Sequence, residues 1–94
     1  MTYKLDFLKS ALKEWKALAP PIKDQFKKKL AEQLENPHVP SARLSGPKAN
    51  RYKIKLKSLG YRLVYQVEDQ QIVVVVVAIG KREGDAAYRL AASR

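Results

Sequence analysis

The sequence contains no cysteine, a single histidine, and no aspartate or glutamate between residues 36 and 67. Without thiols the fold forms neither disulfides nor thiolate metal sites, which is typical of a reducing cytoplasm, where we expect the protein to reside. The first residues lack the apolar core of a signal peptide, and the longest apolar run, 72–79, is too short to cross a bilayer. We therefore expect no membrane partner.

The common catalytic motifs are also missing. The sequence has no GxSxG, Walker, GxGxxG or HExxH motif, and its acidic residues fall mostly on predicted helix surfaces and turns instead of forming a pair. The only histidine, His38, has no companion at catalytic spacing, so we interpret it as an exposed loop residue. The protein then either only binds or performs its chemistry with lysine, arginine and tyrosine, and we expect no cofactor and no metal.

Length and composition predict a single domain over residues 1–94. The chain has 94 residues, of which 46% are hydrophobic, and this is enough for one two-layer core. The formal net charge is +10, and the positive residues are clustered. A clustered excess of positive charge favours a polyanionic partner, whereas a basic surface kept only for solubility is the weaker interpretation.

The central feature is a predicted basic hairpin. Between residues 51 and 57 basic and apolar side chains alternate strictly, which is the period of a strand with one buried face. A turn at 58–60 then leads to a returning strand over 61–67. If Tyr52, Ile54 and Leu56 are buried, the opposite face presents a row of cations: Arg51, Lys53, Lys55, Lys57 and, from the second strand, Arg62.

The remaining segments predict an α+β domain. Alternation at 2–7 predicts a short strand, and apolar stripes predict helices over 8–18, with Trp15 in the core, and from the prolines at 20–21 to residue 36. The β-branched run at 72–79 predicts a central strand covered on both faces, and 85–92 predicts a terminal helix with Asp85 as its N-cap. The expected order is β-α-α-β-β-β-α, with a mostly antiparallel four-stranded sheet and a helical hairpin on one face.

Fixed cations of this kind suit one reaction class. Cleavage of RNA by its own 2′-hydroxyl passes through a phosphorane that carries more charge than the substrate, so cations aimed at it stabilise the transition state preferentially. A lysine among other cations has a lowered pKa and can move a proton, and a tyrosine can do the same or stack on a base. We expect the groups to converge from four elements: Lys53, Lys55, Arg62, Arg82 and Tyr88.

These residues lie in motifs that resemble the RelE toxins of the RelE/ParE toxin–antitoxin superfamily. The similarity is carried by YKIKL at 52–56, GYRLVYQV at 60–67, GKRE at 80–83 and Tyr88, and further by LDF at 5–7, ALKEW at 11–15 and FKKKL at 26–30. It covers almost the whole chain, although the loop at 45–50 departs from the family pattern in length and charge. The resemblance implies a small RelE-like domain that acts as the toxin of a type II toxin–antitoxin pair.

The implied activity is that of a metal-independent endoribonuclease, an mRNA interferase that cuts mRNA in the ribosomal A site and so inhibits translation. By this resemblance Lys53, Lys55 and Arg62 would hold the scissile phosphate. Arg82 would lie near the leaving 5′-oxygen, and Tyr88 would stack on or deprotonate the nucleotide. Which of these groups acts as acid or base stays open, because coupled cations share their titration. The terminal site has no histidine, which favours the RelE branch over relatives with a catalytic His and Glu.

The resemblance also implies partners. These are a cognate RelB-type antitoxin that wraps the domain and displaces the helix around Tyr88, the ribosome with mRNA in its A site, and operator DNA reached only through the antitoxin complex. We expect nucleic-acid or ribosome contacts from the other basic residues near the hairpin: Arg43, Lys48, Arg51, Lys57 and Lys81.

Two other functions stay open. A ParE-like chain of the same fold would inhibit a protein such as DNA gyrase without catalysis, although ParE-like chains lack this set of lysines, arginines and tyrosine. A plain RNA-binding module would bind without cutting.

Each site residue also has a structural interpretation. The lysines can be the solvated face of an edge strand, Arg62 can pair with Glu68 or Glu83, Arg82 can be a solvated charge, and Tyr88 can be a packing residue.

Overall fold

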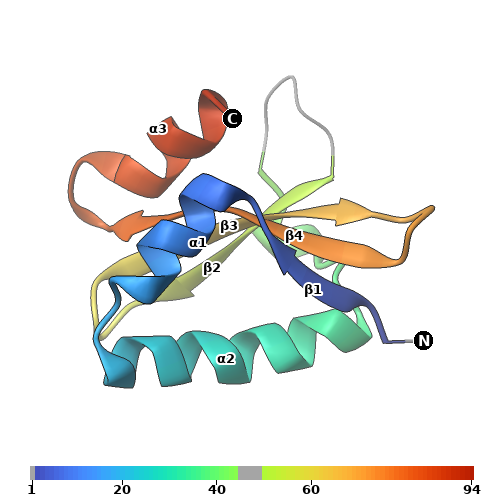
Figure 1. The fold of residues 1–94 in the computed structure, drawn as a ribbon, viewed down its shortest axis with the longest axis horizontal. Coiled ribbons are helices and arrows are strands. Elements are labelled where there is room, and N and C mark those ends of the chain that lie inside the picture. Colours follow the sequence, from blue (N-terminus) through green and yellow to red (C-terminus); the bar gives the residue numbers. More distant parts are fainter. Residues whose placement is uncertain (1, 45–49) are drawn as a thin grey trace.

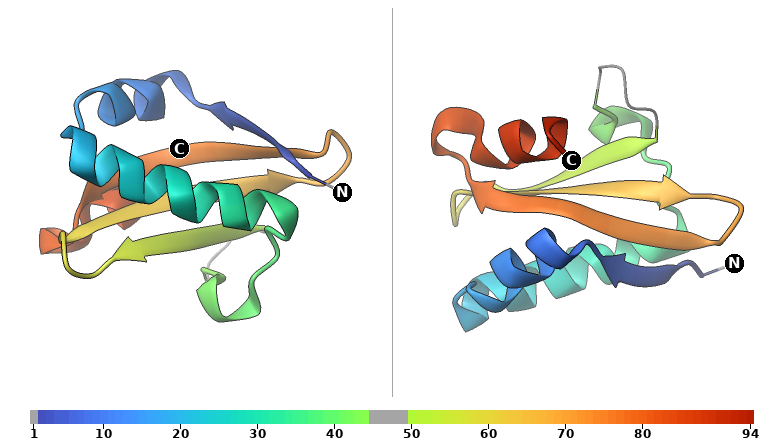
Figure 2. Two further views of the ribbon diagram at one scale, coloured as in Figure 1. Left: turned by 90° about the horizontal axis from the view of Figure 1, so that it is seen from below. Right: turned by 45° about the horizontal axis from the view of Figure 1, so that its top comes forward.

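A computed structural model describes residues 2–44 and 50–94 of the chain and shows three layers (Figures 1 and 2). Helices α1 and α2 lie on one side of a four-stranded sheet, and α3 lies on the other. The elements follow in the order β1 (Lys4–Phe7), α1 (Lys9–Lys16), α2 (Pro20–Glu35), β2 (Arg51–Leu56), β3 (Tyr61–Glu68), β4 (Val73–Lys81) and α3 (Ala86–Ala92), with 3₁₀ turns at Pro40–Ala42 and Glu83–Asp85. The predicted α+β class and element order are therefore confirmed.

The sheet has the strand order β1-β4-β3-β2. Strands β2, β3 and β4 are antiparallel neighbours, whereas β1 runs parallel to β4 because the two helices carry the chain back across one face. The β-branched segment is thus an inner strand, as its sequence predicts. Val74 and Val76 face α1 and α2, while Val77 and Ala78 lie in the cluster under α3.

The main core lies between the sheet and the first two helices. The four-residue repeat of α2 brings Phe26 and Leu30, which are 0% and 1% exposed, onto the sheet. Trp15 of α1 packs against this core, with its ring 5.3 Å from that of Phe7 and 6.4 Å from that of Phe26. The core interpretation of Trp15 is confirmed.

A β-bulge in β4 changes which residues face α3. Val64 pairs with Ala78 and Tyr65 with Val76, so Val77 is the extra residue. Strict alternation through β4 would turn Gly80 toward α1 and α2. The bulge instead turns it toward α3, where an added Cβ would lie 3.0 Å from the Ala87 nitrogen. The sheet and α3 can approach this closely because the residue at this point is glycine.

Beyond the short β1, side chains replace the missing strand partner of β4. The pairing of β1 and β4 ends where the Leu8 amide donates to the Val76 carbonyl. Past that point the Ile79 amide donates to the Glu14 carboxylate of α1 at 3.0 Å. Arg94 donates to both carboxylate oxygens of Glu14 and to the Val77 carbonyl. This arrangement provides hydrogen-bond partners for the Ile79 amide and the Val77 carbonyl at the edge of β4, and it attaches the end of the chain to α1.

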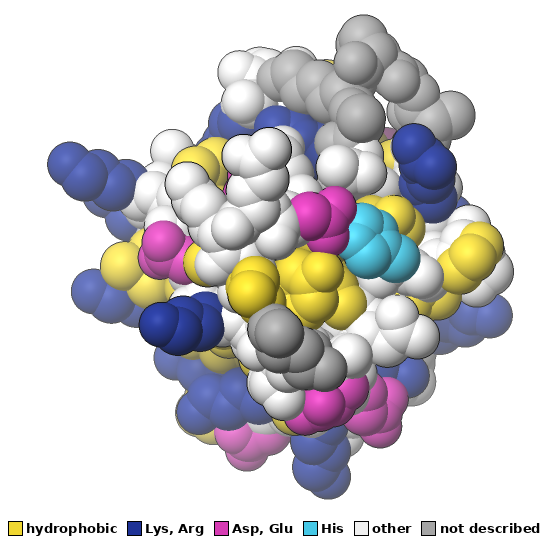
Figure 3. Space-filling model, turned by 90° about the vertical axis from the view of Figure 1, so that its right-hand side faces the viewer, with side chains coloured by type: hydrophobic (Ala, Val, Ile, Leu, Met, Phe, Trp, Pro, Cys, Tyr) yellow, Lys and Arg dark blue, Asp and Glu magenta, His cyan; other side chains and the backbone are white. Residues whose placement is uncertain are grey.

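At the opposite end of the sheet a hydrogen-bonded cluster joins four segments. Figure 3 shows the histidine side chain, in cyan, at the surface beside an acidic side chain. His38 contacts the Tyr52 hydroxyl through Nδ1 at 2.9 Å and Asp69 through Nε2 at 2.7 Å, and the Tyr3 hydroxyl donates to the same carboxylate oxygen at 2.8 Å. Because a carboxylate only accepts, Nε2 carries a proton and donates to Asp69. His38 is therefore not simply an exposed loop residue: 39% of its side chain is exposed, and both ring nitrogens have partners.

Several element boundaries differ from the predictions. Strand β1 begins at Lys4 and leaves Leu5 39% exposed, because only one neighbouring strand and one helix cover it. Helix α3 begins at Ala86, so Asp85 occupies the predicted N-cap position, but its side chain makes no capping hydrogen bond to the helix. Among the described helices, none is long and apolar enough to span a bilayer.

Replacing Glu14 by alanine should destabilise the protein. The substitution leaves the Ile79 amide without its acceptor and the Arg94 guanidinium with only the Val77 carbonyl, which costs about 1–3 kcal/mol. Urea unfolding measures the loss, and amide exchange at Ile79 should accelerate. The control is Glu32→Ala on the exposed face of α2, which should change stability by no more than about 0.5 kcal/mol. An equal effect of both substitutions would contradict the proposed role of Glu14.

Replacing Asp69 by asparagine should destabilise the protein only where Asp69 is ionised. Hydrogen bonds from His38 and then Tyr3 lower the pKa of Asp69 below its ordinary value of 3.8. A lowered folded-state pKa adds stability above the unfolded value, and this stability is lost as the pH falls through the folded value. Urea midpoints of the two proteins should differ at neutral pH and converge as the pH falls through the lowered pKa of Asp69. A difference that is constant with pH, or one that Asp24→Asn reproduces, would contradict this account.

Candidate active site

The β2–β3 hairpin brings the basic residues of two strands together. Lys55 lies directly opposite Arg62 in the register, and Lys53 lies opposite Val64. The turn depends on Gly60, which has a φ of 71° and whose amide donates to the Leu56 carbonyl. The Gly60 carbonyl accepts a 2.8 Å hydrogen bond from the Arg82 amide, so the end of β4 is held beside the turn.

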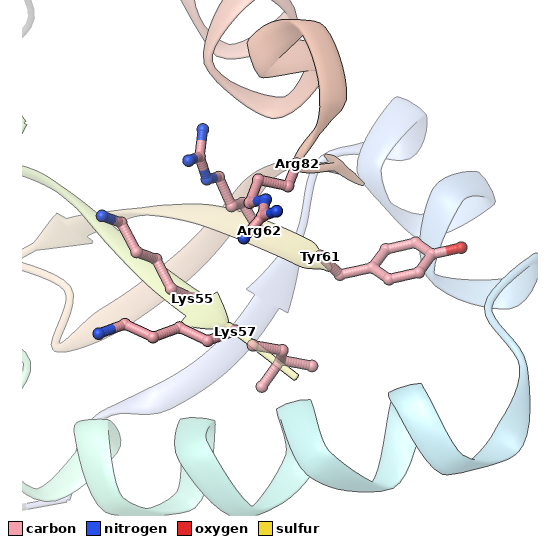
Figure 4. Close-up of a pocket in the computed structure, with 6 residues that line it drawn as sticks. Lys55, Lys57, Tyr61, Arg62 and Arg82 are labelled. Atoms are coloured by element: carbon pink, nitrogen blue, oxygen red, sulfur yellow. The ribbon is translucent and has the colours of Figure 1, made fainter. Parts of the chain in front are cut away.

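These segments surround a small hollow of about 160 Å³. Figure 4 shows the side chains of Lys55 and Lys57 projecting to the same side, with the two arginines nearby, whereas the Tyr61 ring points away from the lysine ammonium groups. None of the lining residues is acidic. They are Lys55, Leu56, Lys57, Tyr61, Arg62 and Arg82.

The crowding of positive charge lowers the pKa of Lys55. The largest cause is the charge of the neighbouring Lys53, followed by desolvation and by the charges of Arg62 and Lys57. Each of these makes the ammonium form less favourable. A lysine with a lowered pKa loses its proton more readily, which suits a group that has to accept a proton during a reaction.

Helix α3 positions Tyr88 against this cluster. The small side chains of Ala87 and Ala91 pack on Val64 and Val77 of the sheet, which lets the helix lie close to the strands. The Arg62 guanidinium carbon lies 4.9 Å from the centre of the Tyr88 ring, within the range of a cation–π contact. Burial is the main cause that raises the pKa of the Tyr88 hydroxyl.

Arg62 has a further partner that the sequence did not predict. Its guanidinium forms an ion pair with Asp85, not with Glu68 or Glu83. The Nε of Arg62 and the hydroxyl of Tyr88 are both buried, and neither has a hydrogen-bond partner among the residues that the structure describes. An unsatisfied buried polar group typically costs about 1–3 kcal/mol, so a hydrogen-bond partner for either group would lower the free energy of the site.

The five predicted catalytic residues therefore lie close together. Lys55, Arg62 and Arg82 line the hollow, Lys53 lies close enough to lower the pKa of Lys55, and Tyr88 contacts Arg62. Their roles in a reaction stay a prediction.

The predicted contact residues are more dispersed. Lys57 lines the hollow, and Lys81 is exposed at the end of β4. Arg43 is exposed at the other end of β2, where it forms an isolated bridge with Tyr52. Lys48 lies outside the described residues.

The alternation predicts that Arg51 presents its charge to solvent, but in the structure this residue is buried. Its side chain is 7% exposed. The guanidinium donates to the Ala91 carbonyl of α3 at 2.6 Å and to the Gln66 side chain at 2.9 Å. The prediction of an exposed contact residue is therefore wrong for this conformation, because α3 covers this end of the strand.

The basic surface continues past the edge of the sheet. A second hollow of about 390 Å³ shares Lys55, Leu56 and Lys57 with the first and extends to Gln25 and Lys29 of α2. The predicted site included neither Lys29 nor Tyr61. Tyr61 lines the first hollow because it lies next to the turn, although the alternation of the hairpin places it on the face that packs against the core.

Comparison with known proteins assigns the chain to a family. Residues 5–86 match the family described as the ParE toxin of the type II toxin–antitoxin system parDE. This match covers most of the chain, which therefore belongs to the toxins of type II toxin–antitoxin systems.

Within these toxins the chain is similar to RelE. It is 50% identical over 94 residues to the mRNA interferase toxin RelE of Escherichia coli (strain K12), a match that spans 100% of this chain and 98% of that protein.

Two solved structures of E. coli RelE are also similar to this chain. A doubly substituted E. coli RelE in the free state superposes with a TM-score of 0.90 at 49% identity, over 100% of this chain and 98% of that one. The toxin of the intact E. coli RelBE toxin–antitoxin complex gives 0.81 at 52% identity, over 86% and 98% of the two chains. The resemblance to RelE toxins is confirmed.

Removing the charge of Lys53 should raise the pKa of Lys55. Lys53→Met deletes the largest cause of the lowered value and keeps the length of the side chain. NMR titration of the lysine side chains measures the shift. The matched control is Lys4→Met, which makes the same charge change on the distant edge strand β1. If both substitutions move Lys55 equally, its lowered pKa reflects net charge and not the cluster.

Proposed function

We propose that this chain is a RelE-type toxin, an endoribonuclease that cuts mRNA in the A site of the ribosome by attack of the RNA 2′-hydroxyl. One observation carries the proposal: Lys55, Arg62 and Arg82 surround a hollow without a lining carboxylate, on a chain 50% identical to an mRNA interferase. A site of this charge binds a phosphodiester and the additional negative charge of its transition state. The chain acts as a single domain over residues 1–94.

In this reaction the 2′-oxygen forms a bond to phosphorus as the bond from phosphorus to the 5′-oxygen breaks. The products are a 2′,3′-cyclic phosphate and a 5′-hydroxyl. Lys53, Lys55 and Arg62 hold the phosphate, and a lysine of this group, or Tyr88, takes the 2′-hydroxyl proton. The lowered pKa of Lys55 supports the first of these alternatives. Arg82 stabilises the charge that develops on the leaving oxygen, which gains a proton.

The proposed partners follow from the same charge. The ribosome offers a dense array of phosphates to Arg43, Lys57 and Lys81, so its binding should weaken steeply with salt. A RelB-type antitoxin, of the kind present in the E. coli RelBE complex, would neutralise the basic face. Operator DNA would be reached only through that complex. The proposed substrate is translated in the cytoplasm, and we place the toxin there.

A second candidate is a ParE-like inhibitor of a protein target such as DNA gyrase. The family match carries the ParE description, and this favours the candidate. Such an inhibitor needs no group that stabilises a phosphorane. Its activity should therefore survive changes to Arg82 that abolish cleavage, and assays of gyrase supercoiling and mRNA integrity in the same extract separate the two functions.

Arg82→Ala should slow cleavage of ribosome-bound mRNA by about 10²–10³-fold, the usual effect of removing one donor aimed at a charged transition state. Primer extension after single-turnover reactions locates and quantifies the cut. Lys13→Ala, an exposed charge on α1, serves as the control and should cleave at nearly the original rate. An Arg82→Ala protein that cuts equally fast would refute the proposed function.

A further inference from the structure

Among the residues that the structure describes, Asp85 supplies the carboxylate that forms an ion pair with the basic site. Its side chain pairs with Arg62, which is the cation that also touches Tyr88. The other acid of this segment, Glu83, is exposed and forms no ion pair within the described part of the chain. Asp85 therefore forms an ion pair with Arg62, whereas Glu83, two residues earlier in the chain, is exposed to solvent.

Asp85 precedes α3 without capping it. Its φ is 50° and its ψ is 40°, a left-handed conformation that most residues avoid, and it makes no capping hydrogen bond. Gly84 before it also has a positive φ, of 65°. Two consecutive left-handed residues turn the chain sharply between β4 and α3, and the turn directs the carboxylate to Arg62.

The contact engages the Nη1 of Arg62, one of the N–H donors that would bind a phosphate. An arginine fork binds a carboxylate and a phosphodiester in the same way, through N–H donors directed at paired oxygens. With Asp85 bound, Arg62 lies over the Tyr88 ring, and the Arg62 Nε and the Tyr88 hydroxyl stay buried without partners among the described residues. Burial raises the pKa of Tyr88; the Arg62 charge opposes this effect, and the Asp85 charge adds to it. In this arrangement the Arg62 Nε and the Tyr88 hydroxyl lack the partners that a substrate would supply.

We propose that Asp85 is an internal competitor for the substrate: its carboxylate occupies the phosphate-binding face of Arg62, and the scissile phosphodiester displaces it on binding. This inference rests on the proposed function, because it concerns the same site. Asp85 then weakens RNA binding without taking part in the reaction, and its displacement frees Arg62 and the Tyr88 ring to meet the nucleotide. The arrangement limits the affinity of the free toxin for RNA that is not presented correctly.

A positioning role is the competing explanation. If Asp85 instead holds Arg62 in its reactive orientation, its loss slows the reaction of bound substrate. The two explanations predict opposite kinetics: a competitor affects KM, whereas a positioning residue affects kcat.

The test compares Asp85→Asn with Glu83→Gln. Both substitutions remove one negative charge from the same turn, and asparagine tolerates the left-handed conformation well. The concentration dependence of cleavage is measured on ribosomes programmed with mRNA. Glu83→Gln reports the effect of net charge alone. Asp85→Gly provides a second variant suited to the positive φ, and thermal unfolding checks that all three remain folded.

We expect Asp85→Asn to lower KM roughly two- to fivefold beyond any effect of Glu83→Gln, the range given by a partly exposed ion pair, with kcat unchanged. Asp85→Gly should behave in the same way. A KM equal to that of Glu83→Gln, or a fall in kcat, would overturn the inference. If the unsubstituted chain cuts no mRNA, the proposed function fails. The inference is then decided by fluorescence anisotropy with a 2′-O-methyl RNA oligonucleotide, which Asp85→Asn should bind more tightly than Glu83→Gln does.

Discussion

The crowding of like charges on one face of the β2–β3 hairpin is the constraint on which the rest of the structure depends. Like charges placed opposite each other in a sheet destabilise it by up to about 1 kcal/mol per pair. Full burial of one large apolar side chain contributes about 1.5–3 kcal/mol, and the reverse face of the hairpin buries six. They are Tyr52, Ile54, Leu56, Leu63, Tyr65 and Val67. The hydrophobic core therefore outweighs the repulsion, and the fold can maintain a basic site.

Helix α3 is a component of both the core and the site. Its alanines complete the second hydrophobic cluster, and its carboxyl-terminal end is held by Arg51 through the Ala91 carbonyl and by the pairing of Arg94 with Glu14. Tyr88 lies nearer its other end, beside two left-handed residues. The helix is thus anchored at its carboxyl-terminal end, while the end next to Arg62 is joined to the sheet by an exposed turn.

The three basic positions Arg51, Lys53 and Lys55 show how far sequence reasoning reaches. All three follow the same alternation, and it correctly places them on the face away from α1 and α2. Yet Arg51 is buried, Lys53 is half-buried and Lys55 is exposed, because α3 crosses only one end of the strand. Asp85 illustrates the same limit. Its type and position favour a helix cap, but the left-handed backbone turns it toward a cation 23 residues away in the sequence.

By itself the sequence determined the elements, the face of each strand that is buried, and the set of cations and the tyrosine available for chemistry, because side-chain period and residue type are local properties. Tertiary structure decided the bulge at Val77, the course of α3 over Arg51, and the pairing of Arg62 with Asp85. These depend on contacts between distant segments, where a small shift in register or helix position changes which polar groups meet. The same charged residue is therefore a surface contact or an internal anchor according to what covers it.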